Sequence, residues 1–212
     1  MGLLVDHEIR DLIKKGDLKV EPFDDSLINP SGLDFRCGRH YTKTVPTGRR
    51  VWQRDKLGSV REVIKYEQVG PDSYIESEYD GALPVIDPSD KSTFKDETFE
   101  ADEYWLAPGE TILVSMMEKL TLPPYLSMKI AGKSSLARLF IDNSSPGGYL
   151  DPCWRGYITC EISNWRQDAY VRLYEGMKIG QLIIFSHELP DKDYSETGRY
   201  RDQAPGSGSL GV

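Results

Sequence analysis

The first part of the chain changes from helical to strand-like spacing of its hydrophobic positions. Residues 6–15 place Ile9, Leu12 and Ile13 on one face of a helix, and Gly16 follows as a stop signal. This stretch therefore predicts a short amphipathic helix. The runs LKVEPF and SGLDFRCG that follow predict short strands, separated by a segment rich in turn residues.

The spacing becomes less regular between about Thr42 and Glu103. The runs RRVWQ and REVIKYEQV still predict strands. Residues 66–103 are acidic and rich in turn residues, which predicts an extended loop or hairpin insertion. A solvated surface arm without chemistry is the default interpretation of such an insertion.

From Tyr104 onward, short strand-like runs alternate with Pro-Gly and Pro-Pro breaks. Closely spaced short strands with turn signals predict an all-β barrel or sandwich. Beyond the N-terminal helix, only the stretch near 134–139 predicts a helix. The polar tail, about 190–212, ends in a Gly/Ser-rich run and is expected to be mobile without a ligand.

Composition fits a single folded domain spanning residues 1–212. The 39% hydrophobic and 28% charged residues are typical of a chain with a normal core. A net charge of -8 argues against a nucleic-acid surface, yet a local positive cluster could still bind a small anion. No signal peptide, lipidation motif or apolar run of membrane-spanning length is apparent, which predicts a soluble, cytoplasmic protein without a membrane partner.

The three cysteines, Cys37, Cys153 and Cys160, are scattered, and none forms a Cys-x-x-Cys pair. The three histidines form no His-x-Glu pair. A zinc site needs three or four ligands with short spacings, and a disulfide framework needs paired cysteines. We therefore expect small, partly buried thiols and no zinc.

The segment AGKSSLARLF, residues 131–140, resembles the end of a nucleotide-binding P-loop within a stretch that looks buried. A P-loop requires a glycine five positions before Gly132, where Ser127 stands instead. On a helical turn, however, Ser134 and Arg138 would share one side, and the helix start could face an anion. The alternative is that Ser134 caps a short helix and Arg138 lies along the surface.

The segment GGYLDPCWRGYITCEISN, residues 147–164, contains two carboxylates in apolar surroundings, Asp151 and Glu161. Strand alternation places Tyr157, Thr159 and Glu161 on one face. A carboxylate in a partly apolar pocket has a raised pKa and can act as a general base. The alternative is that Asp151 begins a turn and Glu161 pairs with a cation on the surface.

Several ordered motifs carry a family resemblance. The runs GKSSLARL, YLDPCWRGYITCEISN and EGMKIGQLIIF resemble the dCTP deaminase branch of the dUTPase superfamily. The N-terminal helix, the strand and the SGLDFRCG run resemble the same branch, and GRYRDQ resembles its closing C-terminal motif. The resemblance covers roughly 3–49 and 104–203, and leaves the acidic segment outside.

This resemblance implies a mainly β fold: a distorted, dUTPase-like barrel (β-clip) that forms a homotrimer with active sites shared between subunits. It implies hydrolytic deamination of dCTP to dUTP and ammonia, in the supply of dTTP precursors, with dTTP as a candidate inhibitor. Magnesium would bind through the triphosphate, and zinc would not be needed.

The resemblance also implies roles for individual residues. Glu161 matches the general base that activates water, Ser134 and Arg138 match the pair that positions this water, and Asp151 matches a contact to the deoxyribose. The matching nucleotide contacts are Lys133, Ser135, Tyr149, Thr159, Gln181, Tyr194, Arg199, Tyr200 and Gln203.

Two departures from the family pattern leave alternatives open. Lys133 replaces an arginine and lacks its bidentate fork. The run GGYLD resembles relatives that deaminate dCTP and also release pyrophosphate, and it resembles plain dUTPases, with Asp151 serving a second water. The non-enzymatic alternative is a nucleotide-binding regulatory module.

Overall fold

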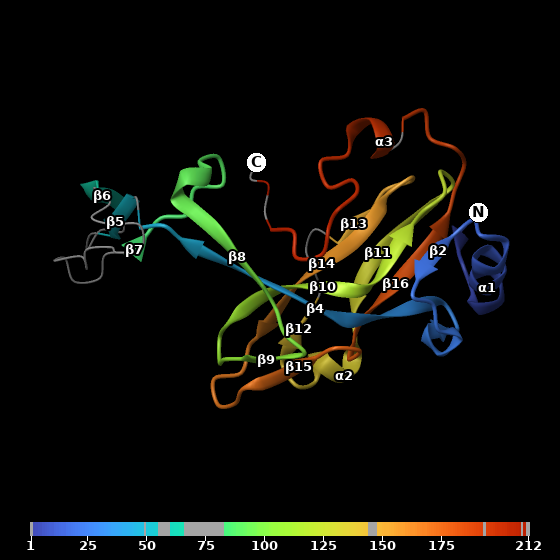
Figure 1. Ribbon diagram of the computed structural model, residues 1–212, viewed down its shortest axis with the longest axis horizontal. Coiled ribbons are helices and arrows are strands. Elements are labelled where there is room, and N and C mark those ends of the chain that lie inside the picture. Colours follow the sequence, from blue (N-terminus) through green and yellow to red (C-terminus); the bar gives the residue numbers. More distant parts are fainter. Residues whose placement is uncertain are drawn as a thin grey trace. The chain divides into compact units, whose positions relative to one another are not determined.

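The structure, a computed structural model, describes residues 2–48, 50–54, 60–65, 83–143, 148–192, 194–208 and 210. The chain divides into two compact units: Met1–Thr42 with Thr98–Ser207, and Lys43–Glu97 with Gly208–Val212. All the candidate site residues lie in the first unit. The strands (Figure 1) are β1 (Gly2–Leu3), β2 (Lys19–Glu21), β3 (Ile28–Asn29), β4 (Gly32–Pro46), β5 (Arg50–Arg54), β6 (Val60–Lys65), β7 (Leu83–Pro84), β8 (Phe94–Glu100), β9 (Glu103–Leu106), β10 (Thr111–Thr121), β11 (Leu126–Gly132), β12 (Ile141–Asp142), β13 (Tyr149–Leu150), β14 (Arg155–Asn164), β15 (Val171–Tyr174) and β16 (Lys178–Ser186).

The first unit is built on one curled sheet in the order β12-β14-β10-β4-β16-β11-β13. β1 adds to β16, β2 adds to β10, and β3 and β8 add to β4. β15 and β9 form a separate small sheet. Consecutive strands along the chain are often not neighbours, so the sheet brings distant sequence segments together. The prediction of a mainly β chain is confirmed.

The predicted N-terminal helix is confirmed as α1 (Asp6–Lys15). Its Ile9 is fully buried, and the αL residue Gly16 ends it with a φ of 79°. Acidic residues in the first turn and lysines in the last turn both stabilise the helix, because their charges interact favourably with the helix dipole. The other helices are short: η1 (Asp25–Leu27), η2 (Lys91–Thr93), α2 (Ser134–Ala137) and α3 (Tyr194–Thr197). None of the helices that the structure describes could span a membrane.

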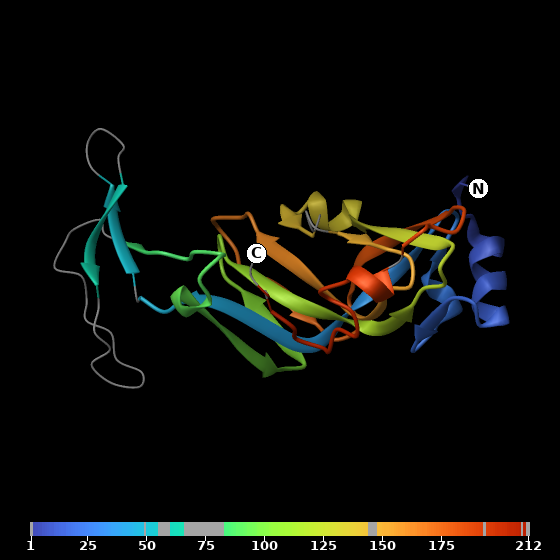
Figure 2. The same ribbon diagram turned by 90° about the horizontal axis from the view of Figure 1, so that it is seen from above.

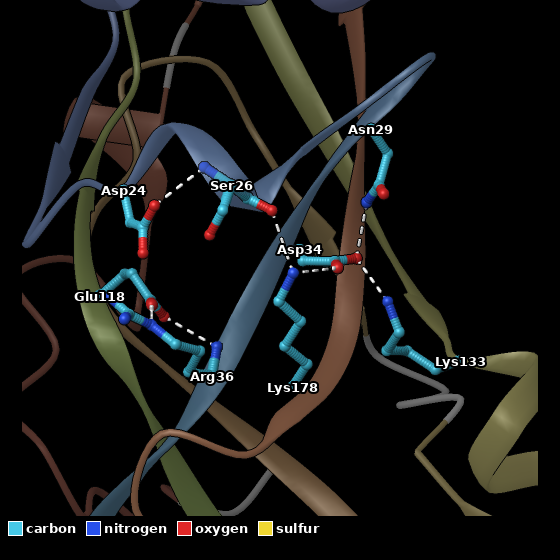
Figure 3. A network of polar contacts seen from close by, with 8 residues as sticks. All are labelled: Asp24, Ser26, Asn29, Asp34, Arg36, Glu118, Lys133 and Lys178. Atoms are coloured by element: carbon cyan, nitrogen blue, oxygen red, sulfur yellow. Dashed lines mark hydrogen bonds and ion pairs between the residues drawn. The ribbon is translucent and has the colours of Figure 1, made fainter.

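A bulge in β10 turns one carboxylate inward. Residues 115–119 of β10 lie opposite residues 157–159 of β14, so β10 carries extra residues there. Within this stretch Glu118 is fully buried, and its Oε1 lies 2.6 Å from Nε of Arg36 on β4. Its Oε2 accepts a hydrogen bond from the Arg36 backbone N–H at 3.0 Å (Figure 3). The bulge therefore creates a buried ion pair inside the curled sheet.

The second unit contains the sheet β6-β5-β7 and the turn around η2. The strands predicted in RRVWQ and REVIKYEQV correspond to β5 and β6. Of the acidic segment, residues 66–82 lie outside the described part. Residues 83–103 contain β7, η2, β8 and the start of β9.

Candidate active site

The P-loop-like segment leaves β11 and forms α2 at the surface. Leu136 is its one buried residue, whereas Ser134, Ser135 and Arg138 are exposed. The expectation of a buried stretch is therefore wrong, and its polar side chains face solvent. Lys133 occupies the N-cap position and Ser134 is the first helical residue, so Ser134 does not serve as the cap.

Lys133 is held by a buried carboxylate that the sequence did not single out. Its Nζ lies 2.6 Å from Oδ1 of Asp34, whose side chain is 3% exposed. Asn29 donates to the same oxygen at 2.7 Å, and Nζ of Lys178 lies 3.3 Å from Oδ2 (Figure 3). Burying a carboxylate is unfavourable unless it is paired and hydrogen-bonded, and these contacts meet that need. Two ammonium groups facing one carboxylate leave a surplus positive charge beside α2.

Gln181 belongs to the same neighbourhood. On β16 it pairs with Asp34 of β4 on one side and with Ala131 of β11 on the other. The sheet order therefore brings Gln181 close to the Lys133 end of β11. The signal for Asp34 was its position as a lone carboxylate within the apolar run SGLDFRCG.

The predicted alternation along β14 is confirmed. Tyr157 and Thr159 are half-buried and Glu161 is exposed, whereas the residues between them are buried. Glu161 lies opposite Leu113 of β10. The expectation that Glu161 sits in an enclosed pocket is not met by the single chain, because its side chain faces solvent.

α2 and the end of β14 are linked through β12. Phe140, with a φ of 60°, turns the chain into β12, whose Asp142 pairs with Ser163 of β14. The α2 segment thus adjoins the end of the strand that carries Glu161. Among the described residues, however, no hydrogen bond or ion pair joins Glu161 to Ser134 or Arg138. Direct polar contacts therefore do not join this predicted group within the described part of the chain.

Asp151 begins a tight turn between β13 and β14. The Trp154 N–H donates to its carbonyl at 3.2 Å, and Cys153 has a φ of 64°. Asp151 itself is half-buried, and Tyr149 on β13 is exposed. The Tyr194 N–H donates to the carbonyl of Pro152 at 3.1 Å, so the C-terminal segment, residues 194–207, approaches this turn.

The C-terminal segment (red in Figures 1 and 2) lies beside β14. Gln203 forms a parallel bridge with Gly156, and its Nε2 donates to Oγ1 of Thr159 at 3.1 Å. The Arg155 guanidinium pairs with Asp202 and lowers the pKa of that carboxyl. The sequence predicted a mobile tail, and the structure places this part of it against the strand that carries Glu161.

Three further predicted contacts of the C-terminal segment, Tyr194, Tyr200 and Arg199, also take defined positions. The Tyr194 hydroxyl oxygen accepts a hydrogen bond from the Tyr200 N–H at 3.0 Å, and both rings are half-buried. Arg199 is exposed. The structure thus joins Tyr194 with Tyr200 and Thr159 with Gln203, while the α2 residues form a separate group.

The thiols match the expectation of small, partly buried groups. None of the three forms a disulfide; Cys37 and Cys160 are buried and Cys153 is half-buried. Within the described part of the chain, no cluster of three or more histidine, cysteine or carboxylate side chains is arranged to hold a metal ion.

Comparison with known proteins identifies relatives over almost the whole chain. A protein of Methanoregula boonei named "dCTP deaminase, dUMP-forming" is 33% identical over 205 residues, which cover 95% of this chain and 92% of the relative. A protein of the same name from Corynebacterium glutamicum is 35% identical over 188 residues, covering 89% of this chain and 82% of the relative.

A solved structure shares the fold. The 2'-deoxycytidine 5'-triphosphate deaminase of Agrobacterium tumefaciens aligns with a TM-score of 0.54 and 22% identity, covering 87% of this chain and 48% of its own chain. This chain therefore spans about half the length of that protein, and the likeness concerns the fold alone.

A family profile described as dCTP deaminase-like matches residues 3–78 and 68–187. The matched ranges include the acidic segment, which the sequence motifs had left outside the resemblance. They also include α2, the Asp151 turn and β14. The chain belongs to the dCTP deaminase-like family.

Proposed function

We propose that the protein deaminates dCTP and also releases pyrophosphate, so that the product is dUMP. The observation that carries this proposal is the near full-length similarity to relatives named "dCTP deaminase, dUMP-forming". The run GGYLD before the Asp151 turn supports the second hydrolysis. Accumulation of dUTP, with deamination as the only reaction, is the alternative outcome.

In this proposal Glu161 is the general base of the first step. It removes a proton from water as the oxygen attacks C4 of cytosine, and the amino group leaves as ammonia once it is protonated. The net reaction converts dCTP and water into dUTP and ammonia. Ser134 and Arg138 position this water and stabilise the charge that develops.

A second water then attacks the α-phosphorus, with Asp151 beside it. The bond to the β-phosphate oxygen breaks, and dUTP and water give dUMP and pyrophosphate. The surplus positive charge around Lys133 and Lys178 suits a triphosphate. Magnesium would arrive on the triphosphate as part of the substrate.

A second copy of the chain would complete the site. Glu161 is exposed in the single chain, and no hydrogen bond or ion pair joins it to Ser134 or Arg138 among the described residues. Association as a homotrimer would enclose Glu161 and supply the missing neighbours. The remaining proposed nucleotide contacts are Ser135, Tyr149, Thr159, Gln181, Tyr194, Arg199, Tyr200 and Gln203.

Product analysis tests the proposal directly. Purified protein is incubated with dCTP and magnesium, and ammonia, dUTP, dUMP and pyrophosphate are resolved over time. We expect ammonia and pyrophosphate in equal amounts without accumulation of dUTP. dUTP accumulating alone would remove the second hydrolysis, and cleavage of dUTP with dCTP untouched would overturn the deamination.

Glu161→Gln separates the enzyme from a regulatory module. Loss of the base should slow ammonia release by at least about a hundredfold while dCTP still binds. Glu188→Gln, at another exposed glutamate, is the matched control and should keep full activity. Wild-type protein that binds dCTP without turnover would instead support the regulatory module.

A further inference from the structure

The C-terminal segment is anchored to the sheet at one glycine. The N–H of Gly206 donates to Oγ of Ser115 at 2.5 Å. Its carbonyl oxygen accepts from Oγ1 of Thr42 at 2.7 Å and from Oγ1 of Thr98 at 3.3 Å. Ser115 and Thr42 are each 1% exposed. Three hydroxyls from β10, β4 and β8 thus satisfy both backbone groups of one buried residue.

Glycine is strongly favoured at position 206. Gly206 has a φ of 75°, a conformation that residues with a side chain rarely adopt. A Cβ there would lie 2.7 Å from Cγ2 of Thr98, well inside van der Waals contact. The space between the three hydroxyl groups therefore suits a residue without a side chain.

The anchor lies next to the strand that carries Glu161. Ser115 and Thr159 are paired residues of β10 and β14. Thr159 also receives the side-chain hydrogen bond of Gln203, and the Gln203 carbonyl accepts from the Tyr157 N–H at 3.0 Å. Fixing Gly206 on Ser115 therefore fixes Gln203 on the neighbouring strand.

The backbone of Gln203 passes close to Gly156, which supports the same alignment of the C-terminal segment on β14. At Gly156, opposite Gln203, a Cβ would lie 2.7 Å from the Gln203 nitrogen. The hydrogen bond between Tyr194 and Pro152 ties the other end of the segment. The segment is thus held both at Tyr194 and at Gly206.

We propose that Ser115 and Gly206 are positioning residues for the reaction. They pin the C-terminal segment to its own chain, so that Gln203 is already in place beside Thr159, on the same face as Glu161, when the nucleotide binds. A segment ordered in advance loses less conformational entropy on binding, which favours affinity. The kinetic part of this proposal rests on the proposed function, whereas the anchor itself does not.

Hydrogen exchange and kinetics of two variants test the proposal. Ser115→Ala removes the acceptor of the Gly206 N–H, and Gly206→Ala introduces the colliding Cβ. Ser207→Ala is the matched control, because its Oγ donates to the nearby Ala204 carbonyl and not to the sheet. The amides of Tyr157 and Gly206 report on the segment, and amides of β11 report on global unfolding.

In both anchor variants we expect faster exchange at Tyr157 with unchanged exchange in β11. The KM for dCTP should rise about tenfold with little change in kcat, as expected for one lost buried hydrogen bond that acts on binding. A chain ending at Gln203 should show the same loss, although it keeps that glutamine.

Unchanged protection of Tyr157 in both variants overturns the anchor, whether or not the protein is active. Faster exchange with unchanged KM and kcat overturns the positioning role. If the wild type turns over no nucleotide, the proposed function fails, and the exchange experiment still decides whether the anchor exists.

Discussion

Replacing Glu118 by alanine should strongly destabilise the first unit. The Glu118 side chain is 1% exposed and that of Arg36 is 19% exposed, so this ion pair is largely removed from water. Alanine would leave the guanidinium without its carboxylate and the Arg36 N–H without its acceptor. A second, longer contact to the Pro22 carbonyl, at 3.4 Å, would remain.

The expected loss follows from this environment. Removing one partner of a buried pair costs about 3 to 5 kcal/mol, and the partial exposure of Arg36 places this case near the lower end. For a chain of this length, that loss corresponds to a fall in Tm of roughly 6 to 12 °C. Circular dichroism during thermal and urea unfolding, at one fixed protein concentration, measures the loss.

The double variant with Arg36→Met provides the internal control. Methionine removes the stranded charge, so Glu118→Ala should cost much less in that background than in the wild type. A loss below about 1 kcal/mol for Glu118→Ala, typical of an exposed ion pair, would refute the reasoning. Additive losses in the double variant would refute it equally.

Three further predictions concern other parts of the fold. Gly38→Ala should cost about 1 to 3 kcal/mol by overpacking, measured by urea unfolding, because a Cβ would lie 2.8 Å from the Ser115 carbonyl oxygen; an unchanged midpoint would contradict this. Asn164→Ala should lower Tm, since the buried Nδ2 donates to the carbonyl oxygens of Leu106, Ala107 and Ala169, at 2.9 to 3.1 Å, and these hydrogen bonds would be lost; an unchanged Tm would contradict this. Burial raises the pKa of Cys37 to about 11, so its thiolate fraction at pH 8 is about one thousandth, and a thiol reagent followed by mass spectrometry should label Cys153 first; early labelling of Cys37 would show that the burial is wrong.

Local features of the fold could be predicted because their causes lie within a few residues. The spacing of Ile9, Leu12 and Ile13, with Gly16 behind them, is sufficient for α1. Strand alternation was likewise sufficient to place Thr159 and Glu161 on one face of β14. The strand β8 shows the limit of such patterns. Most of its residues are exposed, so no hydrophobic alternation marks it, and its pairing with β4 defines it.

The candidate site was predicted as a set of residues and not as an arrangement. Motifs identified the residues around Ser134 and Glu161, but the exposure of Glu161 depends on the tertiary structure. The partner of Lys133, the carboxylate of Asp34, lies 99 residues away in the chain. Nothing in the local sequence could identify that pairing.

The same distinction holds for the C-terminal segment. Its sequence indicated a polar, glycine-rich end and a closing motif, GRYRDQ, but not where the segment packs. The anchor joins Gly206 to Ser115 and Thr42, which lie 91 and 164 residues away. Backbone propensity and side-chain periodicity act over a few residues, so they specify helices, strand faces and turns. Buried hydrogen bonds and ion pairs depend on which strands become neighbours, and that is settled by packing of the whole sheet.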